Sequence, residues 1–120
     1  MSNSRHILTF SVKLYIVTKI NSQYKGDSET PYTPEEMECL KEMRGLINEI
    51  EYINENSNTV DADDRKLNAA DNLKSIWESV RKVFKDVKEL NDARETLILA
   101  NYALLSLAPH LESFLMNIQM

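Results

Sequence analysis

Apolar residues recur at alternating steps of four and three between residues 34 and 55, which predicts an amphipathic helix. The apolar positions are Cys39, Met43, Leu46, Ile50 and Ile53, widened by Leu40 and Ile47. Thr33 is placed to cap this helix, Pro34 suits its first position, and Glu36 completes a capping box. We therefore expect a helix with one buried side and a glutamate-rich side facing water. Gly45 in its middle marks either a close helix crossing or a position without a packing reason.

The same spacing continues in the second half of the chain and predicts one long helix over residues 61–90. Its apolar face contains Leu73, Trp77, Val80, Phe84 and Val87, with Ile76, Val83 and Leu90 beside them. Three apolar positions per heptad are typical of a helix in a bundle. Asp61, Asp63 and Asp64 at its start suit the positive end of the helix dipole.

Two further helices are predicted after residue 90. Asn91 or Asp92 can cap a helix over residues 92–107, which is apolar around nearly its whole circumference and therefore suits the centre of the bundle. Pro109 cannot continue that helix. The spacing of Leu111, Phe114, Leu115 and Ile118 then predicts a short amphipathic helix over residues 109–119.

The first segment, residues 5–21, carries two conflicting signals. Apolar and polar residues alternate from Leu8 to Ile16, as in a half-buried strand, but the run is longer than an ordinary strand and contains no Gly or Pro. No second strand is predicted for it to pair with. We expect a helix over residues 5–21, packed as a mostly buried first element. The alternative is a β-strand over residues 5–20 that a second copy or a partner completes.

Composition agrees with an all-α protein. Two Gly and three Pro in 120 residues favour long helices, and we expect one compact bundle of four to five helices spanning residues 1–120. Cys39 is the only cysteine, so no internal disulfide forms. No secretory signal and no apolar run of about 20 residues is present, which indicates a cytoplasmic protein without a membrane partner.

The net charge of −5 is concentrated in residues 33–60, which contain seven Glu and only two basic residues, Lys41 and Arg44. An acidic segment of this kind argues against a nucleic-acid partner, which requires a basic stripe. The Asn- and Asp-rich run after residue 54 lacks the Gly and Glu of a calcium loop. His6 and His110 have no second ligand at helical spacing, and no phosphate loop or nucleophile motif is present. We expect no catalytic residue, no metal, no cofactor and no enzymatic activity.

Protein binding is the function class that these features favour. Tyr24 and Tyr32 lie in a polar loop of about twelve residues, longer than loops usual between bundle helices, where an aromatic either folds back onto the bundle or anchors a partner. We take them as candidate partner-binding residues, together with three carboxylates on the charged helix: Glu35, Glu38 and Glu42. The alternative is a structural subunit that assembles into a homo-oligomer.

The chain as a whole is rich in Asn, Lys, Ile and Glu, and two stretches illustrate its character: RHILTFSVKLYIVTKINSQYKG and NENSNTVDADDRKLNAADNLK. In the composition of these stretches and in its size, the chain resembles Bacillus-phage anti-defence proteins that inhibit a sirtuin-domain NADase defence system. The resemblance implies a non-enzymatic inhibitor in the host cytoplasm. Its implied partner is a large host defence NADase, which it keeps from being activated by phage structural proteins. No functional residue is transferred by it.

Overall fold

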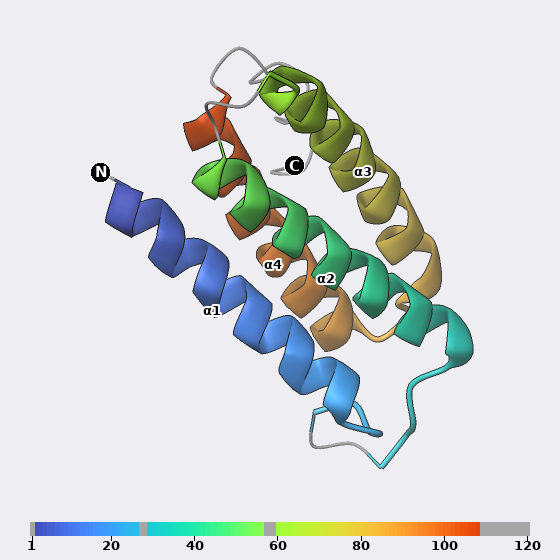
Figure 1. Ribbon diagram of the computed structural model, residues 1–120. Helices are drawn as coiled ribbons and strands as arrows, with labels where there is room; N and C mark the ends of the chain where they lie inside the picture. The colour runs from blue at the N-terminus through green and yellow to red at the C-terminus, as the bar shows by residue number, and fades with distance from the viewer. Residues whose placement is uncertain (1, 27–28, 57–59, 109–120) are drawn as a thin grey trace.

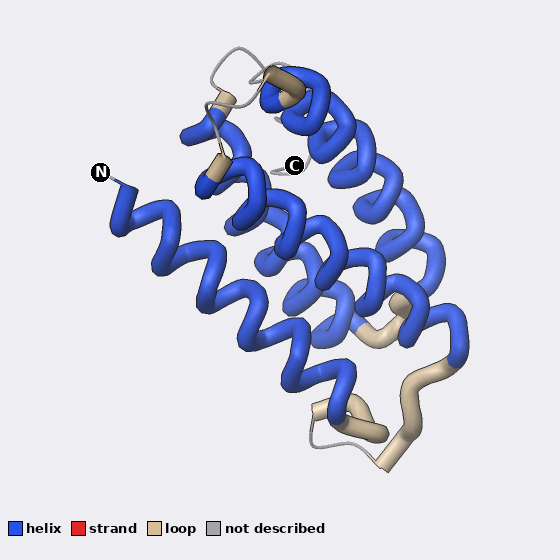
Figure 2. The backbone as a smooth tube through the Cα atoms, viewed as in Figure 1, coloured by secondary structure: helices blue, strands red, loops and turns tan. Residues whose placement is uncertain are grey.

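Four helices form the part of the chain that the computed structural model describes, which is residues 2–26, 29–56 and 60–108, with side chains from residue 11 onward. They are α1 (Ser2–Asn21), α2 (Pro34–Glu55), α3 (Ala62–Val83) and α4 (Val87–Leu107). Consecutive helices run in opposite directions and lie side by side (Figure 1). The described residues contain helices and loops without a strand (Figure 2). The predicted all-α bundle is confirmed.

The start of α2 forms as its sequence predicts. The Thr33 hydroxyl accepts a hydrogen bond from the Glu36 backbone N–H at 3.1 Å, and the Glu36 carboxylate accepts one from the Thr33 N–H at 2.8 Å. These two bonds satisfy donors that a helix start leaves open. All seven apolar residues predicted for the inner face of α2 are buried.

The helices α2 and α4 are the central pair of the bundle. Each contacts the other three helices, whereas α1 and α3 lie on opposite sides of the pair. On α4, Ala93, Ala100 and Ala103 are buried beside Leu97 and Leu104. Alanine side chains allow neighbouring helices to approach closely. The central position predicted for residues 92–107 is confirmed.

The first segment is a helix, so the strand alternative for residues 5–20 is wrong. Helix α1 satisfies its backbone internally, which a lone strand cannot do. It is less buried than expected, because within residues 11–21 only Val12 and Ile16 are buried and Leu14 is 57 % exposed. The Lys13 ammonium contacts the Glu51 carboxylate of α2 at 3.2 Å. Helix α1 therefore covers one side of the bundle.

The prediction of one helix over residues 61–90 is wrong. Helix α3 ends at Val83 and α4 begins at Val87, five residues before the predicted start at residue 92. Phe84 leaves the helical conformation, with φ −84° and ψ 112°, and its side chain is buried. The Asp86 carboxylate then accepts a hydrogen bond from the Glu89 N–H at 3.0 Å and caps α4. Because of this break, Val87 is 71 % exposed where the predicted face required burial.

At its other end α4 stops at Leu107, where the Ala108 N–H donates to the Leu104 carbonyl at 2.8 Å. The helix predicted over residues 109–119 lies outside the described residues. Within the described ranges, no helix combines the length and the apolar character that a membrane span requires.

The Asp86 cap is tested by Asp86→Ala. We expect the free energy of unfolding to fall by about 1 kcal/mol, because a backbone donor at the start of α4 loses its acceptor. Urea denaturation followed by circular dichroism measures the change. Lys85→Ala, at an exposed neighbouring position, is the control and should change stability by less than about 0.5 kcal/mol. Equal effects of the two substitutions would contradict the capping role.

Candidate functional site: the acidic stripe of α2 and the groove beside α3

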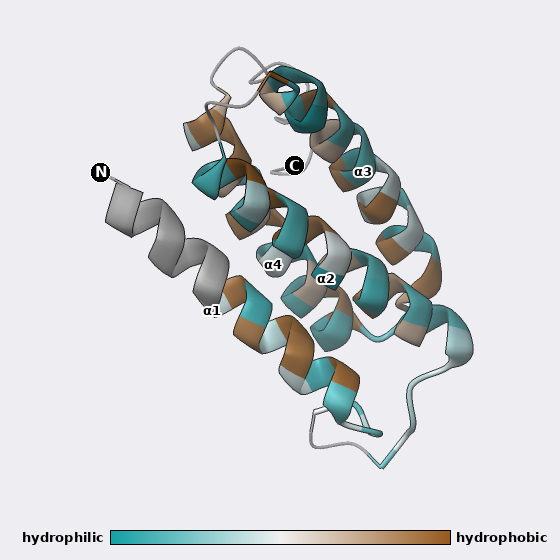
Figure 3. Cartoon of the chain, viewed as in Figure 1, coloured by the Kyte–Doolittle hydropathy of each residue, from teal (hydrophilic) through white to brown (hydrophobic). Residues whose placement is uncertain are grey.

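Four glutamates form one stripe along the outside of α2, and we call them the acidic stripe: Glu35, Glu38, Glu42 and Glu49. Their spacing of three, four and seven residues places them on one face of the helix. Three of them are exposed and Glu49 is half-buried. The side of α2 turned to the viewer in Figure 3 is mostly hydrophilic. The glutamate-rich outer side predicted for this helix is confirmed.

The carboxylates at the start of the stripe are not neutralised within the bundle. Glu35, Glu38 and Glu42 form no ion pair with any of the described residues. Some other exposed or half-buried acidic side chains do have a basic partner, namely Glu51 with Lys13, Asp63 with Lys66, Glu78 with Arg81 and Asp92 with Lys88. Asp64, Asp71 and Glu95 are exposed and, like the start of the stripe, form no ion pair within the described residues. The beginning of α2 therefore presents uncompensated negative charge to solvent.

The buried thiol of Cys39 responds to this charge. Its pKa is raised to about 11, first by burial and then by the carboxylates of Glu42, Glu36 and Glu38. Burial and negative neighbours both disfavour a thiolate. Cys39 is therefore an inert core residue and is not a nucleophile.

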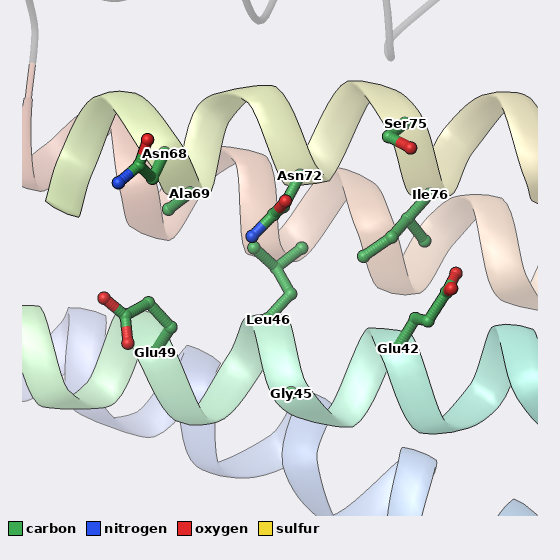
Figure 4. A pocket seen from close by; sticks show the side chains of 9 residues that line it. All are labelled: Glu42, Gly45, Leu46, Glu49, Asn68, Ala69, Asn72, Ser75 and Ile76. Atoms are coloured by element: carbon green, nitrogen blue, oxygen red, sulfur yellow. The ribbon is translucent and has the colours of Figure 1, made fainter.

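A groove of about 420 Å³ opens beside the stripe, between α2 and α3 (Figure 4). Glu42, Gly45, Leu46 and Glu49 line it from α2, and Asn68, Ala69, Asn72, Ser75 and Ile76 line it from α3. A Cβ atom added to Gly45 would have no atom within 4 Å, so this glycine does not permit a close helix crossing. Gly45, Ala69 and Ser75 instead leave space, because their side chains are short.

Glu49, which lines the groove, is already paired with a guanidinium group. The Arg65 Nη1 atom donates to the Glu49 carboxylate at 2.8 Å, and its Nε atom donates to Asp61 at 3.1 Å. The guanidinium carbon lies 4.3 Å from the centre of the Tyr52 ring. These contacts neutralise the last carboxylate of the acidic stripe, and they raise the pKa of Arg65 further. Glu42, seven residues earlier, has no such arginine among the described residues.

The two loop tyrosines lie in different environments. Tyr24 is 47 % exposed, and its backbone forms an isolated bridge with Pro31. Tyr32 is buried, and its hydroxyl donates to the Glu89 carboxylate at 3.4 Å. Burial and Glu89 raise the pKa of Tyr32, so the hydroxyl keeps its proton. Of the two, Tyr24 alone is open to a partner, and Tyr32 is folded back onto the bundle.

Two buried ion pairs lie at the end of the bundle that carries this loop, one between the loop and α2 and one between α1 and α4, and we call them the buried charge cluster. The Lys25 ammonium contacts the Glu36 carboxylate at 2.9 Å, and the Lys19 ammonium lies 3.9 Å from Glu89. Both carboxylates are less than 5 % exposed. Gly26, next to Lys25, adopts a positive φ of 48°, which favours glycine.

The buried charge cluster is structural. Each carboxylate is already paired with a lysine and accepts a hydrogen bond from a second group, the Thr33 N–H for Glu36 and the Tyr32 hydroxyl for Glu89. Across the described ranges, no group of three or more His, Cys, Asp or Glu side chains is arranged to hold a metal ion. The exposed stripe and groove are therefore the better candidate for function.

The residues of the groove on α3 were not predicted from the sequence. Asn68, Asn72 and Ser75 are spaced by four and three residues, the same spacing that marks an apolar face. A run of short polar side chains at that spacing signals a helix flank that faces a neighbour without filling the space between them. Gly45 supplies the matching signal on α2.

The Lys25–Glu36 pair is tested by Lys25→Met, which keeps the side-chain length and removes the charge. We expect the free energy of unfolding to fall by about 2 kcal/mol, because Glu36 loses its charged partner while remaining buried. Chemical denaturation at pH 7 measures it. Lys13→Met removes a partly exposed pair and should cost about 0.5 kcal/mol. A smaller loss for Lys25→Met than for the control would contradict the assignment.

The raised pKa of Cys39 predicts a stability change at alkaline pH. An unfolded thiol ionises near pH 8.5, whereas the folded thiol keeps its proton until about pH 11. Between these values the folded state binds more protons, so its stability falls as pH rises, by about 1.4 kcal/mol per pH unit from this group. Denaturation from pH 8 to 10.5 should show a shallower decline for Cys39→Ala. Parallel curves for the two proteins would contradict the prediction.

Comparison of the chain with protein-family models, with curated proteins and with solved structures finds no match in any of the three.

Proposed function

We propose that this protein is a small non-enzymatic binding module that docks a protein partner through the acidic stripe of α2. The observation that carries the proposal is the row of three exposed carboxylates, Glu35, Glu38 and Glu42, without ion-pair partners among the described residues and beside an open groove. Like charges on one helical face destabilise the isolated protein slightly. A basic surface on a partner would be attracted to these carboxylates, which relieves their repulsion and speeds association.

The binding surface lies on a well-supported helix. The inner face of α2 is buried by the other three helices, and its start is fixed by the Thr33 capping box and by Lys25. A rigid helix loses little conformational freedom on binding. Tyr24, exposed in the loop that precedes α2, adds an aromatic contact near the beginning of the stripe.

The resemblance to Bacillus-phage anti-defence proteins extends the proposal to a biological role. On that reading the protein is an inhibitor that binds a sirtuin-domain defence NADase and blocks its activation by phage structural proteins. An inhibitor of this kind needs a stable surface and no catalytic group, and the acidic stripe supplies such a surface.

Self-assembly is the alternative, and the exposed apolar residues favour it less. Leu14, Leu67, Val87 and Tyr102 are each at least 45 % exposed, but they are distributed over α1, α3 and α4. Single exposed apolar residues are normal on monomers. A second copy would also bring a net charge of −5 against the same charge.

The proposal is tested by neutralising the stripe with Glu35→Gln, Glu38→Gln and Glu42→Gln together. The unmodified protein should co-elute with a Bacillus sirtuin-domain defence NADase and should suppress NAD⁺ consumption when a phage structural protein activates it. The triple variant should bind at least about tenfold more weakly, because three charge contacts are lost. Pull-down and an NAD⁺ assay measure the two effects.

The matched control is Asp64→Asn, Glu78→Gln and Glu95→Gln, which neutralises three exposed carboxylates of α3 and α4. Because both variants have the same net charge, equal loss of binding would remove the acidic stripe as the docking surface. Absence of co-elution, together with undiminished NAD⁺ consumption, would overturn the inhibitor role. Light scattering that shows a homo-oligomer without a partner would favour the structural subunit.

A further inference from the structure

The groove between α2 and α3 combines features that select one kind of ligand. Its polar walls carry the carboxylates of Glu42 and Glu49 opposite the amides of Asn68 and Asn72 (Figure 4). No lysine or arginine is among the side chains that line it. Glu49 is already paired with Arg65, whereas Glu42 has no cation beside it in the described part of the chain. The part of the groove next to Glu42 therefore repels anions, so a ligand that fits here brings positive charge.

Most of the remaining lining is apolar and suits an aliphatic stem. Leu46, Ala69 and Ile76 are buried residues that form the inner surface of the groove. Long cationic side chains cover apolar surface with their methylene groups while their charged ends reach polar atoms. A volume of about 420 Å³ lies within the range of sites that hold a small ligand, and it accommodates one such side chain with part of its backbone.

Arginine fits the polar atoms better than lysine does. On α2, Glu42 supplies a carboxylate. On the facing helix α3, Asn72 and Ser75 supply side-chain oxygens that can accept hydrogen bonds from a ligand. A guanidinium group presents five donors in one plane and can engage several acceptors at once, whereas an ammonium group is a point charge.

The protein itself contains an example of this recognition. Arg65 lies over the Tyr52 ring and donates at 2.8 Å to Glu49, which lines the same groove. Glu42 lies seven residues before Glu49, or about 10 Å along the helix axis. The groove thus has one carboxylate held by an internal arginine and an equivalent carboxylate that is open.

We propose that the groove binds the guanidinium group of an arginine from a basic segment of the protein partner, with Glu42 as its anionic ligand. This inference rests on the proposed function, because it names the chemistry of the segment that the binding module recognises. Gly45 is the specificity determinant, because its missing side chain leaves the space beside Glu42 open.

Two blocked twelve-residue peptides test the inference with the full chain. Both have an alanine and glutamine background; one carries three arginines spaced three and four residues apart, and the other carries citrulline, the neutral isostere, at those positions. Titration of ¹⁵N-labelled protein should give chemical-shift changes at Gly45, Asn68, Asn72 and Ser75 with the arginine peptide. The citrulline peptide should give none at the same concentration.

Three variants assign the binding to the groove. Glu42→Gln should weaken the arginine peptide about five- to tenfold, as expected for a charged hydrogen bond at a partly open site. Gly45→Leu should abolish binding by filling the groove, and it should fold because a Cβ at this position meets no atom within 4 Å. Glu78→Gln, an exposed carboxylate of α3, should leave the affinity unchanged. A dispersed amide spectrum verifies folding in each case.

Equal binding of the arginine and citrulline peptides would overturn the inference, and so would equal weakening by Glu42→Gln and Glu78→Gln. Partner capture that depends on the acidic stripe, combined with the absence of arginine-selective shifts, would overturn the groove site while leaving the proposed function in place. If neither partner capture nor arginine-selective shifts are observed, both the proposed function and the groove site are overturned.

Discussion

Two carboxylates are buried at the same end of the bundle, and neutralising them is the constraint on which the rest of the structure depends. Glu36 lies in the first turn of α2 and Glu89 in the first turn of α4, and each is less than 5 % exposed. A buried charge without a partner costs several kcal/mol, so each requires a nearby cation. Lys25 from the loop and Lys19 from the last turn of α1 meet this requirement. The end of α1, Lys25 and the starts of α2 and α4 are thereby held together.

The apolar stripe of α2 decides which side of that helix faces water. With the capping box and Lys25 fixing its start, α2 turns its apolar stripe toward α4 and its glutamates outward. The groove follows from the neighbour on that outer flank, because α3 meets α2 there with Ala69, Asn72 and Ser75. Side chains this short contribute to stability less than a filled interface would. They leave a charged, accessible space that is better suited to binding than to packing.

Local sequence rules were sufficient for most of the helices and insufficient at one break. The start of α2 was predicted to the residue, because the Thr33 cap and Pro34 act over a single turn. The break between α3 and α4 was missed although Asp86, three residues before Glu89, is a recognised start signal. The continuous apolar pattern favours one unbroken helix, whereas Asp86 favours a new helix start. Burial of Phe84 outside the helix and the Asp86 cap together favour the break.

The sequence by itself determined that the chain is helical, where α2 begins, which of its faces is apolar and where its negative charge lies, because these depend on spacing and capping within one helix. Tertiary structure alone decided that Tyr32 is buried while Tyr24 is exposed, since that depends on Glu89, which lies 57 residues further along the chain from Tyr32. It also decided that Gly45 and Asn72 line one groove from neighbouring helices (Figure 4). Contacts between distant segments leave no period in the sequence, so only the folded chain reveals them.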